Sequence, residues 1–351
     1  MISFIYLSKK YIKNFLIIAF ALSFFATLID LVSHIASLDG FNKKILYSFY
    51  IFEDILHLIY PMALVLGAIL TYYQLIIKNH LLAFGSFSYD KKRLVKTFLL
   101  LSILIYLIFI ALDFTPFAYA HANAGIVLRG NGENSINQTF FKYNNSFVYA
   151  DRLNVVNREF ENVKIYKIKD LKLQEIIEFK KAKFQKDRWI ANDVTIKKFE
   201  YNGTKPLGFK VQHQDKIAVL KGYYPKVIKL LYEGKRIDLA NGIKALKLLN
   251  SQQIDNTKVL SALYAKVLMP LIAPFLIVIF FSFTPLHRRA LNLGKYLFWT
   301  MGSTIILWLV LYSLNTLSQS ATIDPNFLLP VVISILFAYT TFVWFRNINK
   351  L

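Results

Sequence analysis

The residues that most often carry catalysis are few in this chain and stand at no useful spacing. There is no cysteine, so thiolate catalysis and zinc or iron–sulfur sites with cysteine ligands are excluded. The sequence has no G-x-x-x-x-G-K-[ST] phosphate loop, no H-E-x-x-H zinc motif and no G-x-S-x-G nucleophile elbow. Its six histidines are scattered, as is typical of surface or interfacial side chains. We therefore expect no catalytic residue, no metal site and no cofactor.

Three charged residues lie within or beside long apolar stretches, where charge is costly and often functional. Asp30 and Asp113 stand near the ends of their stretches, where a carboxylate can also simply meet lipid headgroups. Lys266 with Lys43 and Lys44 could form a cationic rim for an anionic lipid headgroup, although a long lysine side chain can equally snorkel to the interface. We interpret three residues as structural at the interface: Asp30, Asp113 and Pro116.

Composition separates two classes of protein that both carry excess positive charge. The 351 residues include 42 Lys and Arg against 21 Asp and Glu, and a net charge of +21 is common in nucleic-acid-binding proteins. The mean hydropathy of +0.42 instead indicates a chain that lives in lipid. We therefore expect a membrane protein with no nucleic-acid partner.

Six apolar runs are long enough to cross a hydrocarbon core of about 30 Å. They are Phe15–Ala36, Ile55–Ile77, Thr97–Pro116, Tyr264–Phe283, Tyr296–Leu317 and Phe327–Phe345. The first exceeds the apolar core of a signal peptide, so we expect it to be retained. Lys and Arg concentrate in the short loops of one side, which marks that side as cytoplasmic. We expect a multi-pass protein of the inner membrane with both termini in the cytoplasm.

The segment between the third and fourth runs, residues 118–257, contains short stretches that alternate apolar and polar residues. With turn residues between them, they predict an antiparallel sandwich or jelly roll on the periplasmic side. The predicted strands are Phe147–Ala150, Val163–Ile168, Ile176–Phe184, Val194–Phe199, Phe209–Gln212 and Ile217–Leu220. Residues 238–250 instead predict a short amphipathic helix, because apolar residues recur there at spacings of three and four residues and Asp238 can cap the helix.

The predicted fold class is therefore an α+β membrane protein. Three transmembrane helices in residues 1–117 and three in residues 258–351 flank an inserted periplasmic antiparallel β-jelly-roll domain. The inserted segment carries 25 basic and 14 acidic residues, so about half of the excess charge belongs to it.

The loop Lys78–Lys96 is too long for a tight turn and mixes basic with apolar and aromatic residues. Such a segment can lie on anionic lipid as an interfacial helix. It can equally present a helix to a cytoplasmic partner, and composition favours neither interpretation.

Short sequence patterns occur in a fixed order along the whole chain. The N-terminal third has Ile29–Asp30, PMALVLGAIL at Pro61–Leu70 and LDFTP at Leu112–Pro116. The middle has NNSFVYADR at Asn144–Arg152, IYKI at Ile165–Ile168, and Ala182–Phe184 with Trp189. The C-terminal third has LYAKVLMPL at Leu263–Leu271, Asn315, Asp324–Pro325 and Leu329–Pro330. In this order the chain resembles the LptF/LptG (YjgP/YjgQ) permease family of the lipopolysaccharide export ABC transporter, and LptG more than LptF.

The resemblance implies a coupling helix near residues 79–92 that docks on the cytoplasmic LptB ATPase dimer. The residues implied in this contact are His80, Leu81, Phe84, Ser88 and Tyr89. The chain departs from the family pattern here, because His80-Leu81 stands where the family usually has Glu-Leu, and Ser88-Tyr89-Asp90 replaces a Gly-containing end. The docking surface is thus expected to keep its shape with altered electrostatics.

The resemblance also implies the remaining partners. The first and fifth spans would face LptF, the second permease subunit, around a cavity for lipopolysaccharide, and the β-domain would contact LptC and LptA. ATP would be bound by the separate ATPase, so the chain itself would not be an enzyme. The expected function is extraction of lipopolysaccharide or lipooligosaccharide from the inner membrane. The alternative is a membrane-anchored enzyme that modifies lipid headgroups, which would need a convergent acid/base pair in the β-domain.

Overall fold

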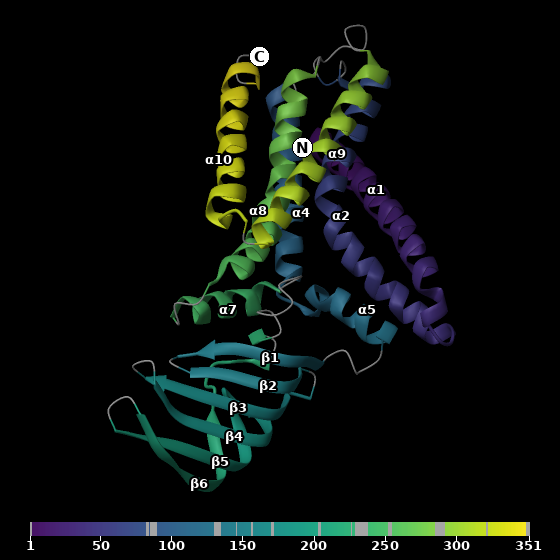
Figure 1. The fold of residues 1–351 in the computed structure, drawn as a ribbon. Helices are drawn as coiled ribbons and strands as arrows, with labels where there is room; N and C mark the ends of the chain where they lie inside the picture. Colours follow the sequence, from purple (N-terminus) through teal and green to yellow (C-terminus); the bar gives the residue numbers. More distant parts are fainter. Residues whose placement is uncertain are drawn as a thin grey trace. The chain divides into compact units, whose positions relative to one another are not determined.

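The computed structural model describes residues 2–81, 84, 90–129, 135–144, 146–155, 157–169, 172–202, 205–225, 227–228, 238–251, 255–284, 292–320 and 322–348. The chain forms two compact units (Figure 1). We call Met1–Leu128 with Leu260–Leu351 the helical unit, and Arg129–Val259 the sheet unit.

Six long helices form the helical unit (Figure 1). They are α1 (Ile2–His34), α2 (Phe41–Ile77), α4 (Lys91–Leu112), α8 (Thr257–Phe283), α9 (Leu293–Gln319) and α10 (Pro325–Val343). Each contains a run apolar enough to cross a membrane, so the six predicted spans are confirmed. The helices are longer than the apolar runs: the 37 residues of α2 extend over about 55 Å, well beyond a hydrocarbon core of about 30 Å.

Short elements continue several of these helices. They are η1 (Ile35–Ser37), η2 (Pro116–Tyr119), α5 (Ala120–Arg129) and the π-helical turn η5 (Trp344–Ile348). The η2 turn begins as its sequence suggests, with Pro116 in the first turn and the Thr115 hydroxyl accepting a hydrogen bond from the Phe117 amide. α5 belongs almost entirely to the helical unit, and the sheet unit begins at Arg129.

Close packing of α1 against α2 depends on Gly67. A Cβ atom at this position would lie 2.9 Å from the Cα atom of Phe15, which real Cβ atoms do not approach. Small residues that let two backbones meet are typical of helix contacts in membranes. The absence of a side chain at Gly67 is therefore what allows α1 to lie against the middle of α2.

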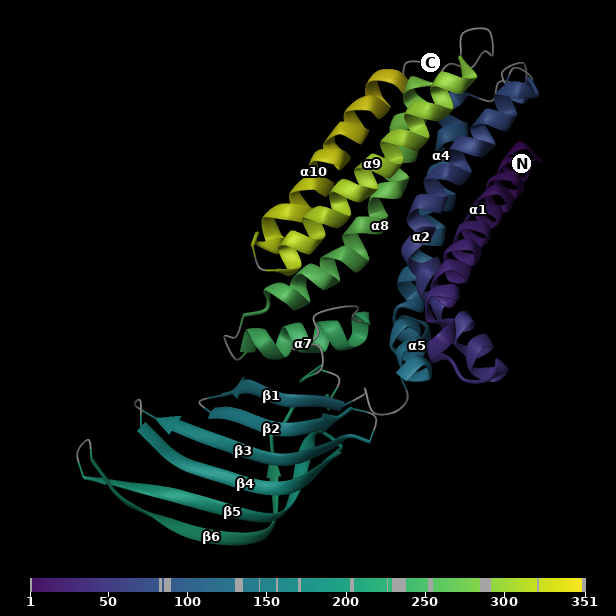
Figure 2. The same ribbon diagram turned by 45° about the vertical axis from the view of Figure 1, so that its right-hand side comes forward.

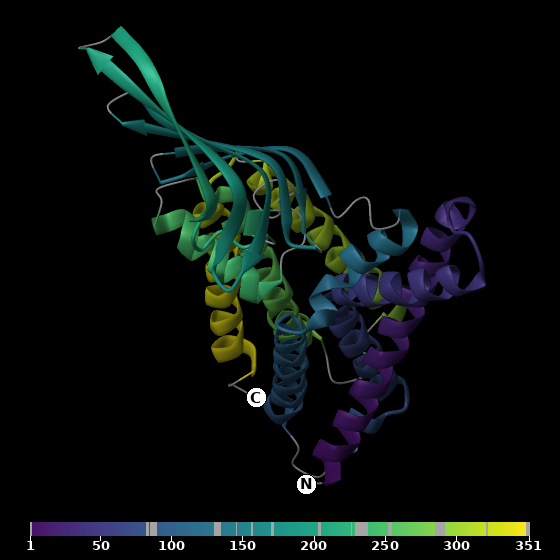
Figure 3. The same cartoon turned by 90° about the horizontal axis from the view of Figure 1, so that it is seen from below.

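The sheet unit contains one six-stranded antiparallel sheet, strongly curved in Figures 2 and 3. Its strands are β1 (Ser135–Tyr143), β2 (Ser146–Asn154), β3 (Glu159–Lys169), β4 (Lys172–Gln185), β5 (Arg188–Asn202) and β6 (Lys205–Val219). The inserted antiparallel sheet is thus confirmed, although β1 was not predicted and two predicted stretches, Phe209–Gln212 and Ile217–Leu220, belong largely to the single strand β6.

The strand order differs from that of a jelly roll. The six described strands follow one another in sequence order, each paired with the next, which makes a meander. A jelly roll needs Greek-key connections between two sheets, and the described strands contain none. Each short turn instead favours pairing with the following strand.

Aromatic side chains fill the concave core of the sheet unit. Trp189 is fully buried, its ring lies tilted against that of Phe160 with centroids 4.1 Å apart, and its Nε1 donates to the Tyr223 carbonyl over 2.7 Å. The Tyr223 hydroxyl in turn donates to the Lys142 carbonyl over 2.9 Å. These contacts tie the segment after β6 to β1 and β5.

The predicted amphipathic helix is α7 (Leu239–Ser251). Asp238 caps it as expected, since its Oδ2 accepts a hydrogen bond from the Asn241 amide. The buried face contains Leu239, Ala245 and Leu249, whereas Ile243 of the predicted apolar stripe is 52% exposed.

Candidate functional site

Polar side chains inside the helical unit gather toward its two ends. We call the end formed by the C-terminus of α4 and the N-terminus of α8 the Asp113 end. The opposite end, formed by the N-terminus of α4 and the C-terminus of α8, is the Lys91 end. Lysines and acids among apolar helices need partners there, since an uncompensated charge in such surroundings is very unfavourable.

Asp113 is fully buried at the C-cap of α4 and is contacted from two other helices. Lys266 of α8 donates from Nζ to Asp113 Oδ1 over 2.6 Å, and its side chain is only 14% exposed. Nε2 of His57, on α2, lies 3.5 Å from Asp113 Oδ2. The structure thus brings Asp113 and Lys266 together inside the bundle, where each compensates the other's charge.

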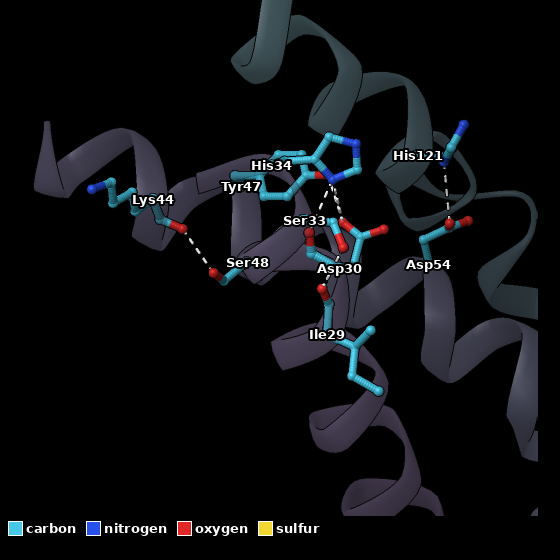
Figure 4. Close-up of polar contacts among 9 residues, drawn as sticks. All are labelled: Ile29, Asp30, Ser33, His34, Lys44, Tyr47, Ser48, Asp54 and His121. Atoms are coloured by element: carbon cyan, nitrogen blue, oxygen red, sulfur yellow. Dashed lines mark hydrogen bonds and ion pairs between the residues drawn. The ribbon is translucent and has the colours of Figure 1, made fainter. Parts of the chain in front are cut away.

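Asp30 joins α1 to α2 near the turn between these helices (Figure 4). The Tyr47 hydroxyl donates to Asp30 Oδ1 over 2.5 Å, and Nδ1 of His34 lies 3.3 Å from the same oxygen. Nearby, Nδ1 of His121 on α5 lies 3.2 Å from Asp54 Oδ2 on α2. Asp30 thus links α1 to α2 through Tyr47.

Lys43 and Lys44 lie in the first turn of α2, with Lys43 exposed and Lys44 half-buried. In Figure 4 the ammonium of Lys44 points away from Asp30. Cations are unfavourable at a helix N-terminus, so these lysines do not stabilise α2 through its dipole. The third member of the expected cationic rim, Lys266, has its charge compensated by Asp113.

At the Lys91 end, the start of the expected coupling helix packs against α1. Nδ1 of His80 lies 2.9 Å from the hydroxyl of Tyr6, whose ring also meets that of Phe84 edge to face. Leu81 is 5% exposed and belongs to the helical core, so its side chain faces the bundle. Ser88 and Tyr89 lie outside the described residues. Burial, with Lys10 and Lys78 nearby, lowers the pKa of His80, which favours its neutral form.

Lys91 is a site residue that the sequence interpretation missed. Its buried Nζ donates to the backbone carbonyls of Ser282 and Thr284, each over 3.0 Å. A usable signal was present: Lys91 stands on the same stripe as the buried residues Leu94, Val95 and Phe98, at spacings of three, four and seven. Tyr6 and His57 were missed because nothing in their local sequence indicates a partner so far along the chain.

Carboxylates in the sheet unit are largely engaged by lysines. Across neighbouring strands, Glu175 pairs with Lys167 and Glu178 with Lys197. Asp151 accepts a hydrogen bond from Asn162. Within the described part of the chain, no three His, Asp or Glu side chains are grouped as metal ligands. This arrangement is typical of solvated strand faces, and the carboxylates described above form no convergent acid/base pair.

A family model of the lipopolysaccharide export system permease LptF/LptG matches residues 5–347. The chain belongs to this family. The match covers the six spans and the inserted sheet, which confirms the resemblance seen in the short sequence patterns. A comparison with curated proteins found no match. The family model covers both LptF and LptG, so the closer likeness to LptG stays a prediction.

This LptF/LptG family chain is therefore a multi-pass inner-membrane protein of a permease family. Its spans differ in how much of their surface the chain itself covers. In the most apolar stretch of each span, 61% of the residues are buried in α2 and 56% in α8, but 22% in α1, 17% in α9 and 22% in α10. α2 and α8 thus form the centre of the helical unit, and α1, α9 and α10 keep broad apolar faces for lipid or for another protein.

Proposed function

We propose that the chain is a permease subunit of the lipopolysaccharide export ABC transporter. In this role it extracts lipopolysaccharide or lipooligosaccharide from the inner membrane and passes it to the periplasmic bridge. The proposal rests on the family match over residues 5–347, which includes both the spans and the sheet. The excess of Lys and Arg in the short loops supports cytoplasmic termini and a periplasmic sheet unit.

The uncovered faces of α1 and α9 support a two-subunit cavity. These are the first and fifth spans, and together with α10 they are the spans whose apolar surface the chain covers least, with 22%, 17% and 22% buried in α1, α9 and α10. In the proposed assembly they face the corresponding spans of LptF around the lipid-binding cavity. An apolar wall of this kind suits a substrate with several acyl chains.

The energy comes from a separate LptB ATPase dimer, and the sheet unit passes the lipid to LptC and LptA. ATP drives the cycle only if its binding favours one cavity conformation over the other, since a ligand shifts an equilibrium by its differential affinity. We call the region near residues 79–92, at the Lys91 end, the coupling segment. It is the proposed contact with LptB.

Co-purification tests this assembly against the enzyme alternative. The full chain, purified from its native membrane in mild detergent, should retain an ATPase and a second six-span protein. ATP hydrolysis by that complex should respond to added lipopolysaccharide. Recovery of the chain alone, with turnover of a lipid headgroup, would overturn the transporter proposal.

Photo-crosslinking tests the headgroup contacts. A photoreactive residue at Lys43 or Lys44 should capture lipid A in membranes, because both lysines lie beside the exposed turn between α1 and α2. The same residue at Lys266 should capture less, since that side chain is 14% exposed and paired with Asp113. Capture from none of the three positions would contradict a cationic rim.

His80 provides a test of the contact with LptB. His80→Glu restores the carboxylate that the family usually carries beside Leu81. If His80 is adapted to its own ATPase, the substitution should reduce lipopolysaccharide release per ATP hydrolysed. Unchanged or improved coupling would show that the histidine is not an adaptation to its partner.

A further inference from the structure

Lys91 is a buried cation whose partners are backbone carbonyls of a distant helix. Lys91 is the first residue of α4 and is 9% exposed. Its Nζ donates to the carbonyls of Ser282 and Thr284, at the C-terminus of α8, each over 3.0 Å. Ser282 and Thr284 follow Lys91 in the sequence by 191 and 193 residues, so the contact joins the two halves of the helical unit.

The helix dipoles explain why Lys91 is stabilised by the end of α8 and not by its own helix. The N-terminus of α4 carries the positive end of its own helix dipole, where a cation is unfavourable. The last carbonyls of α8 have no partner within that helix and carry the negative end of its dipole. The ammonium of Lys91 therefore gains most of its stabilisation from α8, and both hydrogen bonds are of the stronger, charge-assisted kind.

An aromatic cluster strengthens the same junction. The ring of Phe281, one residue before Ser282, lies 4.5 Å from Tyr72 on α2 and 4.9 Å from Phe98 on α4, measured between centroids. Phe98 also contacts Tyr11 on α1. Tyr72 lies before the coupling segment, near residues 79–92, and Lys91 lies at the C-terminal end of that segment. Both ends of the segment are thus held against the end of α8.

We propose that Lys91 is a positioning residue of the export cycle. It clamps the C-terminus of α8 to the start of α4, so that the coupling segment and the second half of the helical unit move together. The transmission part of this inference rests on the proposed function, in which the segment between α2 and α4 binds the ATPase. The clamp itself rests only on the contacts above.

Because the chain has no cysteine, spin labels can be attached at chosen positions to measure the distance between α4 and α8. Spin labels are attached to Leu104→Cys on α4 and Phe283→Cys on α8, both exposed positions, and their separation is measured by double electron–electron resonance. Leu104 lies about 20 Å along α4 from Lys91, which suits the method. The measurement is made on the purified complex without nucleotide and after trapping with ATP and vanadate, in three backgrounds: unmodified, Lys91→Met and Lys96→Met.

The clamp predicts one narrow distance that is the same in both nucleotide states for the unmodified protein. Lys91→Met should shift or broaden that distance, because the α8 carbonyls lose their partner. Lys96→Met should change nothing, since this lysine is on the exposed side of the same helix. An unchanged distance in Lys91→Met, or a distance that changes between nucleotide states in the unmodified protein, would overturn the proposal.

A functional measurement tests the transmission step. The Lys91→Met complex should still contain the ATPase and hydrolyse ATP, but it should release roughly tenfold less lipopolysaccharide per ATP. The reason is that a hydrogen bond to a charged group contributes enough free energy to change an equilibrium constant at least tenfold. Lys91→Arg should recover part of the loss. Full release per ATP in Lys91→Met contradicts the transmission role. If no ATPase associates at all, the proposed function fails, and the nucleotide-free distances still decide the clamp.

Discussion

The buried ion pair at the Asp113 end predicts an asymmetric response to removal of its two members. Lys266→Met leaves the Asp113 carboxylate fully buried, with Nε2 of His57 at 3.5 Å. Removal of one member of a buried pair typically costs about 3–5 kcal/mol. Asp113→Asn should cost less, because the amide oxygen still accepts a hydrogen bond and the partly exposed Lys266 can turn toward the interface.

The double variant separates the ion pair from simple packing. Replacement of both residues, by Lys266→Met with Asp113→Leu, removes both charges and should return the unfolding free energy to within about 1–2 kcal/mol of the unmodified protein. The single effects would then be strongly non-additive, as expected for residues in contact.

Thermal unfolding of the full chain in detergent measures these differences. For a unit of this size, 1 kcal/mol corresponds to about 2–4 °C in Tm, so Lys266→Met should lower Tm by about 6–20 °C. Lys258→Met, an exposed lysine at the start of the same helix, is the matched control and should leave Tm unchanged. The reasoning is refuted if Asp113→Asn is as damaging as Lys266→Met, or if the double variant is no more stable than Lys266→Met.

Three further predictions concern packing and titration. Gly67→Ala should destabilise the helical unit by about 1–3 kcal/mol, because the new Cβ meets the Phe15 backbone, whereas Gly302→Ala, with nothing within 4 Å, should be neutral in the same thermal assay. Trp189→Phe should lower the unfolding free energy of the sheet unit by about 1–3 kcal/mol, because the Tyr223 carbonyl loses its hydrogen-bond donor. Proteolysis within the sheet unit should then be faster, and equal rates would contradict the importance of that bond. Because burial and then Lys10 and Lys78 lower the pKa of His80, its contribution to stability falls as pH drops below about 6.5. Diethyl pyrocarbonate, which modifies neutral imidazole, should label His80 with a midpoint below that pH, and Lys10→Met should raise the midpoint while Lys96→Met leaves it in place.

The six spans could be predicted because hydrophobic length alone decides them. Strands were harder, since each depends on alternation over few residues. β1 escaped prediction because it buries Thr139 and Phe141 while Phe140 is exposed, so its polar and apolar residues do not mark its two faces. The meander was also beyond the sequence, because alternation marks single strands and does not show which strands pair with one another.

The polar contacts of the helical unit were the least predictable part. Asp113 and Lys266 were recognised as unusual, but their pairing was not, because 153 positions separate them. Lys91 resembled the other basic residues of the loop before α4, and its contact with α8 is what distinguishes it. Charge in an apolar segment is therefore a good signal that a contact exists and a poor signal of which residue completes it.

The two buried lysines together give α4 and α8 a common role. Lys266 of α8 binds the C-cap acid of α4 at one end, and Lys91 of α4 binds the C-terminal carbonyls of α8 at the other. The two contacts on α8 are about 24 Å apart along its axis, so together they resist both sliding and splaying of the antiparallel pair. α4 is the last span before the sheet unit in the sequence and α8 is the first after it, so the pair joins the two halves of the bundle directly. With α1, α9 and α10 largely uncovered, any rearrangement of the helical unit is expected to occur by movement of those helices around a fixed α4–α8 pair.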